Sequence, residues 1–160
     1  MDTKILYAPL TMKDSKEFFK LAGDERVAAT MRFDCPRSIE ESDLILADYI
    51  SGCNRAFALR FQPEDELWGV FAFKAESGSD TADLSQMFVP EQWGKGLGNQ
   101  VMHDMVELAR KEKWYKALEG HVLEKNTASC RMAEKSGFRE KERLHFHGMT
   151  EDLIVYRLEI

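Results

Sequence analysis

The chain has 160 residues, of which 44% are hydrophobic and 31% are charged, and its formal net charge is −6 at pH 7. This length and composition predict one globular domain over residues 1–160 and exclude a disordered chain. The acidic balance argues against general binding of nucleic acid, which needs basic patches for phosphate contacts. The same balance is compatible with a cationic substrate.

Neither a membrane span nor a secretory signal is expected. The sequence has no run of about 18 apolar residues, and its first ten residues lack a basic stretch followed by a long apolar run. The three cysteines, Cys35, Cys53 and Cys130, are far apart and show no metal-ligand spacing. We therefore expect a cytoplasmic protein with reduced, structural cysteines and no bound metal.

The chain is expected to begin with one strand and two helices. Residues 4–10 form a short apolar run that is typical of a strand. Thr11 then begins a helix that Gly23 ends. Ser38 and Glu41 have the spacing of a capping box, which predicts the start of the second helix.

Three consecutive strands are expected next. Residues 55–61 and residues 67–74 alternate between apolar and polar positions on either side of a polar turn, which predicts a β-hairpin. Residues 82–89 form the third of these strands, which stops at Pro90.

The pattern then changes to alternating helices and strands. Residues 99–113 form an amphipathic helix, residues 117–123 a strand and residues 126–135 a short helix. Two final strands follow at residues 138–146 and 150–158. The resulting order, β-α-α-β-β-β-α-β-α-β-β, predicts an α/β protein with a mixed sheet and a central β-α-β crossover.

The segment between the third of the consecutive strands and the following helix is the most informative. It reads VPEQWGKGLGN and places glycines at positions 94, 96 and 98 around Lys95. Glycine lets the backbone approach a ligand and adopt positive φ angles. A helix start adds unpaired N–H groups and the positive end of its dipole. The combination predicts an anion site suited to a phosphate or diphosphate.

Other interpretations of the glycines fit less well. A P-loop needs a hydroxyl residue after its lysine, but Lys95 is followed by Gly96. A dinucleotide fold needs G-x-G-x-x-G after the first strand, whereas here G-x-G-x-G follows three consecutive strands. A tight turn with no ligand is the remaining alternative.

The loop and two further segments resemble the GNAT superfamily of N-acetyltransferases, in particular the RimJ/RimL branch. The family's loop, Q/R-x-x-G-x-G/A, corresponds here to residues 93–98, with Trp93 in place of the usual Gln or Arg. A second match spans residues 126–138. Looser matches are Arg143, Gly148, Asp152 and Tyr156 near the end of the chain and Ala8, Pro9, Leu10, Thr11 and Asp14 near its start.

The resemblance implies a GNAT-like, mostly antiparallel central sheet flanked by helices, with acetyl-CoA bound at the crossover. Loop amides would bind the diphosphate, and the backbone of the preceding strand would pair with the pantetheine arm. Asn126 is a candidate cofactor contact, a helix N-cap, or both. A strand amide near Phe88 or Val89 would donate to the thioester oxygen. The implied cofactor-binding residues are Met87, Phe88, Val89, Trp93, Gly94, Lys95, Gly96, Leu97, Gly98, Asn99, Asn126 and Ser129.

Acetyl transfer to an amine needs a base, because an ammonium has no lone pair. His121 is the first candidate, since histidine titrates near neutral pH. Glu119 is the second, because it lies two residues earlier on the same expected strand and so on the same face. Asp83 and Glu91, which flank the cofactor strand, are further carboxylates to consider.

No general acid is assigned. Many relatives carry a tyrosine in the short helix, but Ala133 occupies the matching position here. Cys130 is interpreted as structural. The main alternative to an enzyme is therefore a non-catalytic module that binds acetyl-CoA as a sensor.

The acceptor amine has no recognisable code in the sequence. The resemblance places its pocket around residues 31–38 and 144–150. His145 and His147 alternate on an expected strand there, where a solvated face is the simpler interpretation. A peptide N-terminus, a polyamine and another small amine all remain open as acceptors, and a homodimer is a family-level expectation.

Overall fold

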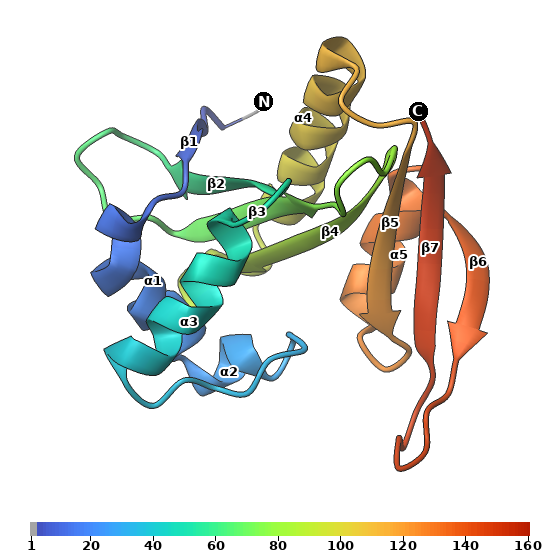
Figure 1. Ribbon diagram of the computed structural model, residues 1–160, viewed down its shortest axis with the longest axis horizontal. Coiled ribbons are helices and arrows are strands. Elements are labelled where there is room, and N and C mark those ends of the chain that lie inside the picture. Colours follow the sequence, from blue (N-terminus) through green and yellow to red (C-terminus); the bar gives the residue numbers. More distant parts are fainter. Residues whose placement is uncertain (1–2) are drawn as a thin grey trace.

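The computed structural model describes residues 3–160, in which seven strands and five α-helices are found (Figure 1). The strands are β1 (Leu6–Pro9), β2 (Arg55–Arg60), β3 (Gly69–Lys74), β4 (Thr81–Phe88), β5 (Ala117–Leu123), β6 (Arg139–Leu144) and β7 (Leu153–Glu159). The helices are α1 (Ser15–Ala22), α2 (Glu25–Ala28), α3 (Ile39–Ile50), α4 (Leu97–Glu112) and α5 (Thr127–Lys135), with 3-10 turns at Met12–Asp14 and Pro90–Gln92.

The strands form one sheet with the order β1-β2-β3-β4-β5-β7-β6. β4 and β5 run parallel, and the other neighbouring pairs are antiparallel. The expected α/β class, with a mostly antiparallel sheet and a β-α-β crossover from β4 through α4 to β5, is therefore confirmed. The short α2 is not predicted by the sequence pattern, because four residues are too few to show an apolar stripe.

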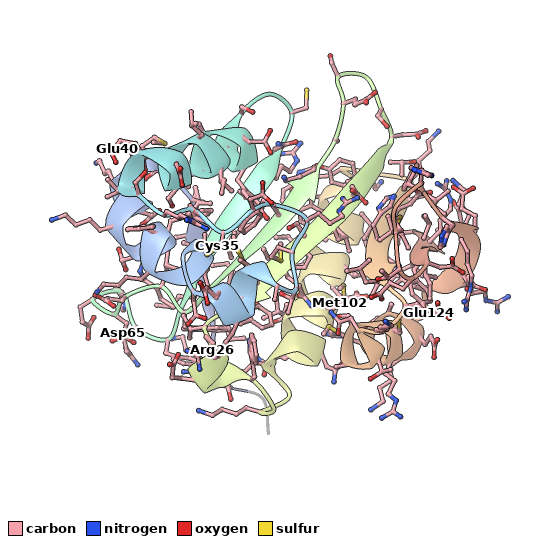
Figure 2. The ribbon with its side chains drawn as sticks, turned by 90° about the horizontal axis from the view of Figure 1, so that it is seen from below. Arg26, Cys35, Glu40, Asp65, Met102 and Glu124 are labelled. Carbon is pink, nitrogen blue, oxygen red and sulfur yellow. The ribbon has the colours of Figure 1, made fainter. Side chains whose placement is uncertain are left out.

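Helices cover both faces of the sheet, with α1 and α3 on one side and α4 and α5 on the other (Figure 2). Strand alternation divides β3 between the two cores: Val70 packs with Phe18 of α1, whereas Phe71 packs with Val101 of α4. This two-sided burial explains why β3 is almost continuously apolar, since each face contacts a separate helical layer.

Capping side chains fix the helix starts that the sequence predicts. Thr11 and Asp14 form a capping box at the 3-10 turn that leads into α1. The Ser38 hydroxyl accepts the backbone N–H of Glu41 at 3.1 Å, and the Glu41 carboxylate accepts the N–H of Arg37 at 2.6 Å. These bonds satisfy N–H groups that a helix start leaves unpaired.

The parallel strands β4 and β5 separate halfway along their length. Their pairing runs from Thr81 opposite Ala117 to Leu84 opposite Gly120 and then stops. The remaining residues of β4, 85–88, pair only with β3. Figure 1 shows the two strands diverging below this point. The divergence leaves an open strand edge inside the molecule, and the site described next lies along it.

Candidate active site

The loop after β4 presents free amides at the start of α4. Gly94 and Gly96 have φ angles of +74° and +77°, in the left-handed region that glycine adopts without strain. In the part of the chain that the structure describes, the N–H groups of Gly94, Lys95 and Gly96 have no acceptor, and no side chain caps α4. These donors and the positive end of the helix dipole form an anion site.

The three glycines of the loop have different surroundings. A Cβ at Gly94 or Gly96 would meet nothing within 4 Å, whereas a Cβ at Gly98 would lie 2.9 Å from Cε of Met132 in α5. Gly98 therefore allows α4 to pack closely against α5, and only the first two glycines leave open space for a ligand. Residues 97–99, expected in the loop, form the first turn of α4.

Trp93 holds the loop against the end of β4. Its Nε1 donates to the carbonyl oxygen of Phe88 at 2.9 Å, and the residue stays 43% exposed. The Nζ of Lys95 lies 3.3 Å from Oε1 of Gln92, at the mouth of the loop. The lysine thus adds a positive charge near the free amides, which favours an anion there.

Val89 uses both of its backbone polar groups within the protein. Its N–H donates to the carbonyl of Trp68 at 2.8 Å, and its carbonyl accepts the N–H of Gln92 at 2.9 Å. The expectation that the Val89 amide donates to a thioester oxygen is therefore wrong. An amide at the thioester oxygen stays a prediction for the neighbouring strand residues, Phe88 among them.

The bond from Val89 to Trp68 also determines which residues of β4 face the open edge. Because ladder bonds of an antiparallel pair alternate, Met87, two residues before Val89, directs its backbone polar groups toward β3, as the Val89 N–H does. Gln86 and Phe88 then direct theirs toward the gap beside β5. Of the three strand residues expected to pair with an extended ligand, Phe88 is thus the one that faces it, and Gln86 is an addition that the sequence did not indicate.

The side chain of Gln86 carries an unsatisfied acceptor. Its Oε1 is buried and has no hydrogen-bond partner within residues 3–160, while its Nε2 lies 2.8 Å from Sδ of Met132. A buried amide oxygen without a donor is costly unless a ligand supplies one. An arm that carries amide N–H groups, such as pantetheine, fits this position.

Asn126 caps α5 as expected. Its Oδ1 accepts the backbone N–H of Ser129 at 3.3 Å, and both residues line the cavity described below. The N-cap interpretation is therefore confirmed, and contact with a cofactor stays a prediction for both side chains.

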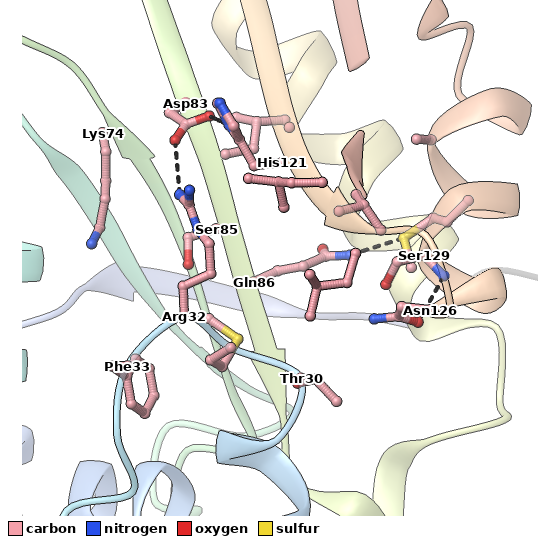
Figure 3. A pocket seen from close by; sticks show the side chains of 18 of the residues that line it. Thr30, Arg32, Phe33, Lys74, Asp83, Ser85, Gln86, His121, Asn126 and Ser129 are labelled. Carbon is pink, nitrogen blue, oxygen red and sulfur yellow. Dashed lines mark hydrogen bonds and ion pairs between the residues drawn. The ribbon is translucent and has the colours of Figure 1, made fainter. Parts of the chain in front are cut away.

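A cavity of about 670 Å³ lies in the gap between the diverging strands. β4, β5 and α5 form one part of its wall, and α3 with residues 30–33 forms the opposite part (Figure 3). Residues 31–33 fall in the first segment expected to form an acceptor pocket. The second expected segment, residues 144–150, does not line the cavity.

His121 faces this cavity and is bonded to Asp83. Its Nδ1 lies 2.7 Å from Oδ1 of Asp83, and its side chain is 21% exposed (Figure 3). Because a carboxylate only accepts, Nδ1 is the donor in this bond, and in the neutral imidazole the lone pair then lies on Nε2. Arg32 lies on the other oxygen of Asp83, with Nη2 at 3.4 Å from Oδ2. A histidine oriented by a carboxylate is the arrangement of a general base.

Glu119 lies outside the cavity lining, in a network of ion pairs. Its Oε2 accepts from Arg157 at 2.7 Å and from Lys141 at 3.1 Å. Partial burial raises the pKa of Glu119, but the hydrogen bonds from Arg157 and Lys141 outweigh it and hold the pKa below its ordinary value. A carboxylate so stabilised is a poor base, so the geometry favours His121.

Two hydroxyl groups in the cavity were not indicated by the sequence. The Tyr49 hydroxyl lies 2.7 Å from Oγ of Ser85, and both residues line the cavity. Burial raises the pKa of Tyr49, more than the Ser85 hydrogen bond lowers it, so the phenol stays neutral near pH 7. An aromatic residue on an amphipathic helix reads as core, which is why the pattern alone did not single out Tyr49.

The expected absence of a tyrosine acid on α5 is consistent with the cavity wall, where Ala133 is buried. Tyr156 of β7 packs instead behind α5, where its hydroxyl donates to Oε1 of Glu134 at 3.1 Å. Burial, followed by the nearby Cys130 and Glu134, raises the pKa of Tyr156. The contact joins two of the segments on which the family resemblance depends.

The remaining candidates lie elsewhere. The Glu91 side chain is 71% exposed at the protein surface, 4.0 Å from Arg26. His145 follows the end of β6 and bonds to Asp152 at 2.8 Å, and His147 is exposed. The expected strand through both histidines is wrong, because β6 ends at Leu144.

Residues 3–160 hold no group of three or more His, Cys, Asp or Glu side chains arranged to bind a metal ion. Across the same residues, no helix has the length and apolar character needed to cross a bilayer.

An anion site that continues into an open strand edge and ends at a His–Asp pair suits a long phosphorylated ligand that lies along β4. The chain belongs to the GNAT acetyltransferase family, since the family model described as "Acetyltransferase (GNAT) domain" matches residues 4–139. A comparison with curated protein sequences gives no match.

Solved structures share the fold. A spermidine N-acetyltransferase from Vibrio cholerae, in complex with CoA and spermine, is 16% identical and superposes with a TM-score of 0.84 over 99% of this chain and 96% of that one. A GNAT acetyltransferase from Bacillus anthracis is 20% identical, with a TM-score of 0.82 over 99% and 97%. An N-acetyltransferase from Staphylococcus aureus Mu50 is 18% identical, with a TM-score of 0.77 over 98% of both chains.

Proposed function

We propose that this protein transfers the acetyl group of acetyl-CoA to the primary amine of a small molecule, with His121 as the general base. The observation that carries the proposal is the His121–Asp83 pair, which lies in the cavity at the open edge of β4. The spermidine N-acetyltransferase from Vibrio cholerae, bound to CoA and spermine, supports a small-molecule acceptor. The loop and the residues 126–138 support placement in the RimJ/RimL branch.

Acetyl-CoA would be held by residues whose hydrogen-bonding groups have no partner within the protein. The amides of residues 94–96 and the start of α4 suit its diphosphate. The N–H of Phe88, whose carbonyl already accepts from Trp93, and the orphaned Oε1 of Gln86 suit the amides of its pantetheine arm. When bound, acetyl-CoA supplies the acetyl thioester, whose C–S bond breaks as the new C–N bond forms.

His121 would remove a proton from the acceptor ammonium. The lone pair on Nε2 accepts that proton, and Asp83, bonded to Nδ1–H, stabilises the resulting imidazolium. The N–H of Gln86, the gap-facing residue of β4 that lies nearer to His121, would donate to the thioester oxygen as negative charge develops there. No side chain is assigned to protonate the leaving thiolate, because Ala133 occupies the family's tyrosine position.

The test is incubation of the full chain with acetyl-CoA and a panel of primary amines and peptide N-termini, measuring CoA thiol release and acetylated product. Transfer to small amines supports the proposal. Stabilisation by acetyl-CoA without transfer to any acceptor would contradict it and favour the non-catalytic sensor. A homodimer and a cytoplasmic location remain predictions from the sequence.

A further inference from the structure

The charges of the cavity constrain the acceptor. Two carboxylates line it, and both are already paired. Asp48 accepts from Nζ of Lys74 at 2.9 Å, and Asp83 accepts from His121 at 2.7 Å and from Arg32 at 3.4 Å. A polyamine needs free carboxylates for its additional ammonium groups, because desolvating an unpaired charge is costly. In the lining each carboxylate already balances one cation, so no carboxylate there is left to balance the extra ammonium of a polyamine.

The two cations of the cavity keep unused donors. The Arg32 side chain is 57% exposed, and its one ion pair is the 3.4 Å contact with Asp83. A guanidinium has five N–H donors in a planar fork, so most of them are available to a ligand. The Lys74 ammonium lies 4.1 Å from the centre of the Tyr49 ring and bonds to Asp48, which leaves further donors.

Arg32, Lys74 and His121 line the same cavity, and two of the three contact Asp83 directly. His121 and Arg32 contact the two oxygens of Asp83, and Lys74 is the register partner of Asp83 on β3 (Figure 3). Directly opposed residues on neighbouring strands have Cβ atoms about 5 Å apart. An acceptor amine beside His121 is therefore within a short chain's reach of both cations.

We propose that the acceptor is a primary amine that also carries a carboxylate, as an amino acid does. Its ammonium lies beside His121, and its carboxylate binds Arg32 and Lys74. Asp48 and Asp83 balance the charge of the two cations, so the unused N–H donors of Arg32 and Lys74 would hold the ligand, which suits one carboxylate better than a phosphate dianion. This inference rests on the proposed function and specifies its substrate class.

Three acceptors that share a tetramethylene chain test the inference: 5-aminopentanoate, pentylamine and 1,4-diaminobutane. A charge-assisted hydrogen bond from Arg32 corresponds to roughly a tenfold effect or more. We therefore expect kcat/KM for 5-aminopentanoate to exceed that for the diamine at least about tenfold, with pentylamine between them. Preference for the diamine, or no preference among the three, overturns the inference.

Separate substitutions of Arg32 and Lys74 test whether these two cations cause the preference for 5-aminopentanoate. Arg32→Gln and, separately, Lys74→Gln should lower kcat/KM for 5-aminopentanoate about tenfold more than that for pentylamine. Arg37→Gln is the matched control, because Arg37 is an exposed arginine of the same segment that does not line the cavity. An equal loss with both acceptors would contradict a carboxylate contact.

Failure of the proposed function gives a different result. If no amine is acetylated, calorimetry of the protein with CoA still measures the binding of 5-aminopentanoate against 1,4-diaminobutane. Tighter binding of the amino acid, weakened by Arg32→Gln, supports the carboxylate site without catalysis. Tighter binding of the diamine overturns it.

Discussion

Nδ1 of His121 on β5 lies 2.7 Å from Oδ1 of Asp83 on β4, although the two residues are 38 positions apart in the chain. The parallel register places Asp83 opposite Glu119, which lies two residues before His121 on β5. The pairing of the two strands ends at the next pair, Leu84 and Gly120. The pair thus lies between the last rungs of the sheet and the open gap. A base placed there is held rigidly by the sheet and still has access to a ligand.

Replacing His121 with alanine should lower kcat by about 10²-fold or more, because general-base catalysis contributes about 10²–10⁴ in rate. The affinity for acetyl-CoA should change little, since the anion site and the open edge of β4 do not include His121. Steady-state kinetics with the best amine of the panel, together with calorimetry with CoA, separates the two effects.

His147→Ala is the matched control for that variant, because His147 is exposed and lies outside the cavity lining. It should behave as the parent protein does. Undiminished turnover in His121→Ala would remove the histidine from the mechanism and return attention to Glu119.

In the proposed mechanism Asp83 positions His121, so Asp83→Asn should also lower kcat. The amide can still accept from Nδ1–H but cannot compensate the charge of an imidazolium. Hydrogen bonds to charged groups contribute about 1.5–3 kcal/mol, which corresponds to roughly a 10- to 150-fold loss. The rate should fall without a comparable change in the affinity for CoA, and circular dichroism should be unchanged. A loss confined to the affinity for CoA would contradict this role.

The glycine turn and the uncapped helix start after β4 could be predicted because their signal is local. Glycines, a lysine and a helix start lie within a few residues, and their backbone properties do not depend on distant partners. The Asn126 cap and the Ser38 capping box were accessible for the same reason. The order of strands and helices followed from periodicity and turn residues.

The arrangement of the cavity could not be predicted, because it depends on registers between strands. In the sequence Asp83 is one of several candidate carboxylates. Only the parallel pairing of β4 with β5 shows that it contacts His121. Either Met87 or Gln86 directs its backbone polar groups to the gap, depending on which residues of β4 form the hydrogen-bonded pairs with β3. The sequence does not reveal this choice. The two cations that pair with Glu119 are Lys141 on β6 and Arg157 on β7, and these strands come close to β5 only in the folded sheet.

Glu119→Gln should affect stability more than turnover. The pKa of Glu119 is lowered in the folded state, so its ion pairs stabilise the protein above the unfolded-state pKa, and this contribution is lost as the pH falls through the folded-state value. At pH 7 the variant should lose about 1 kcal/mol of unfolding free energy. The difference should shrink below a pH of about 4. Urea unfolding at several pH values measures it, and a pH-independent difference would contradict the ion-pair origin.

Gly96→Val should weaken the binding of acetyl-CoA about tenfold or more, because a branched side chain would enter the open space beside the loop amides and block charge-assisted hydrogen bonds to the diphosphate. The substitution also imposes a positive φ on valine, which costs about 1–2 kcal/mol of stability.

Gly78→Val separates the loss of affinity from the loss of stability. Gly78 has a φ of +79° and equally open surroundings, but it lies in the turn before β4, away from the loop. Both variants should show a similar loss in urea unfolding, and only Gly96→Val should lose affinity for CoA in calorimetry. Equal affinity in the two variants would mean that the diphosphate binds elsewhere on the molecule.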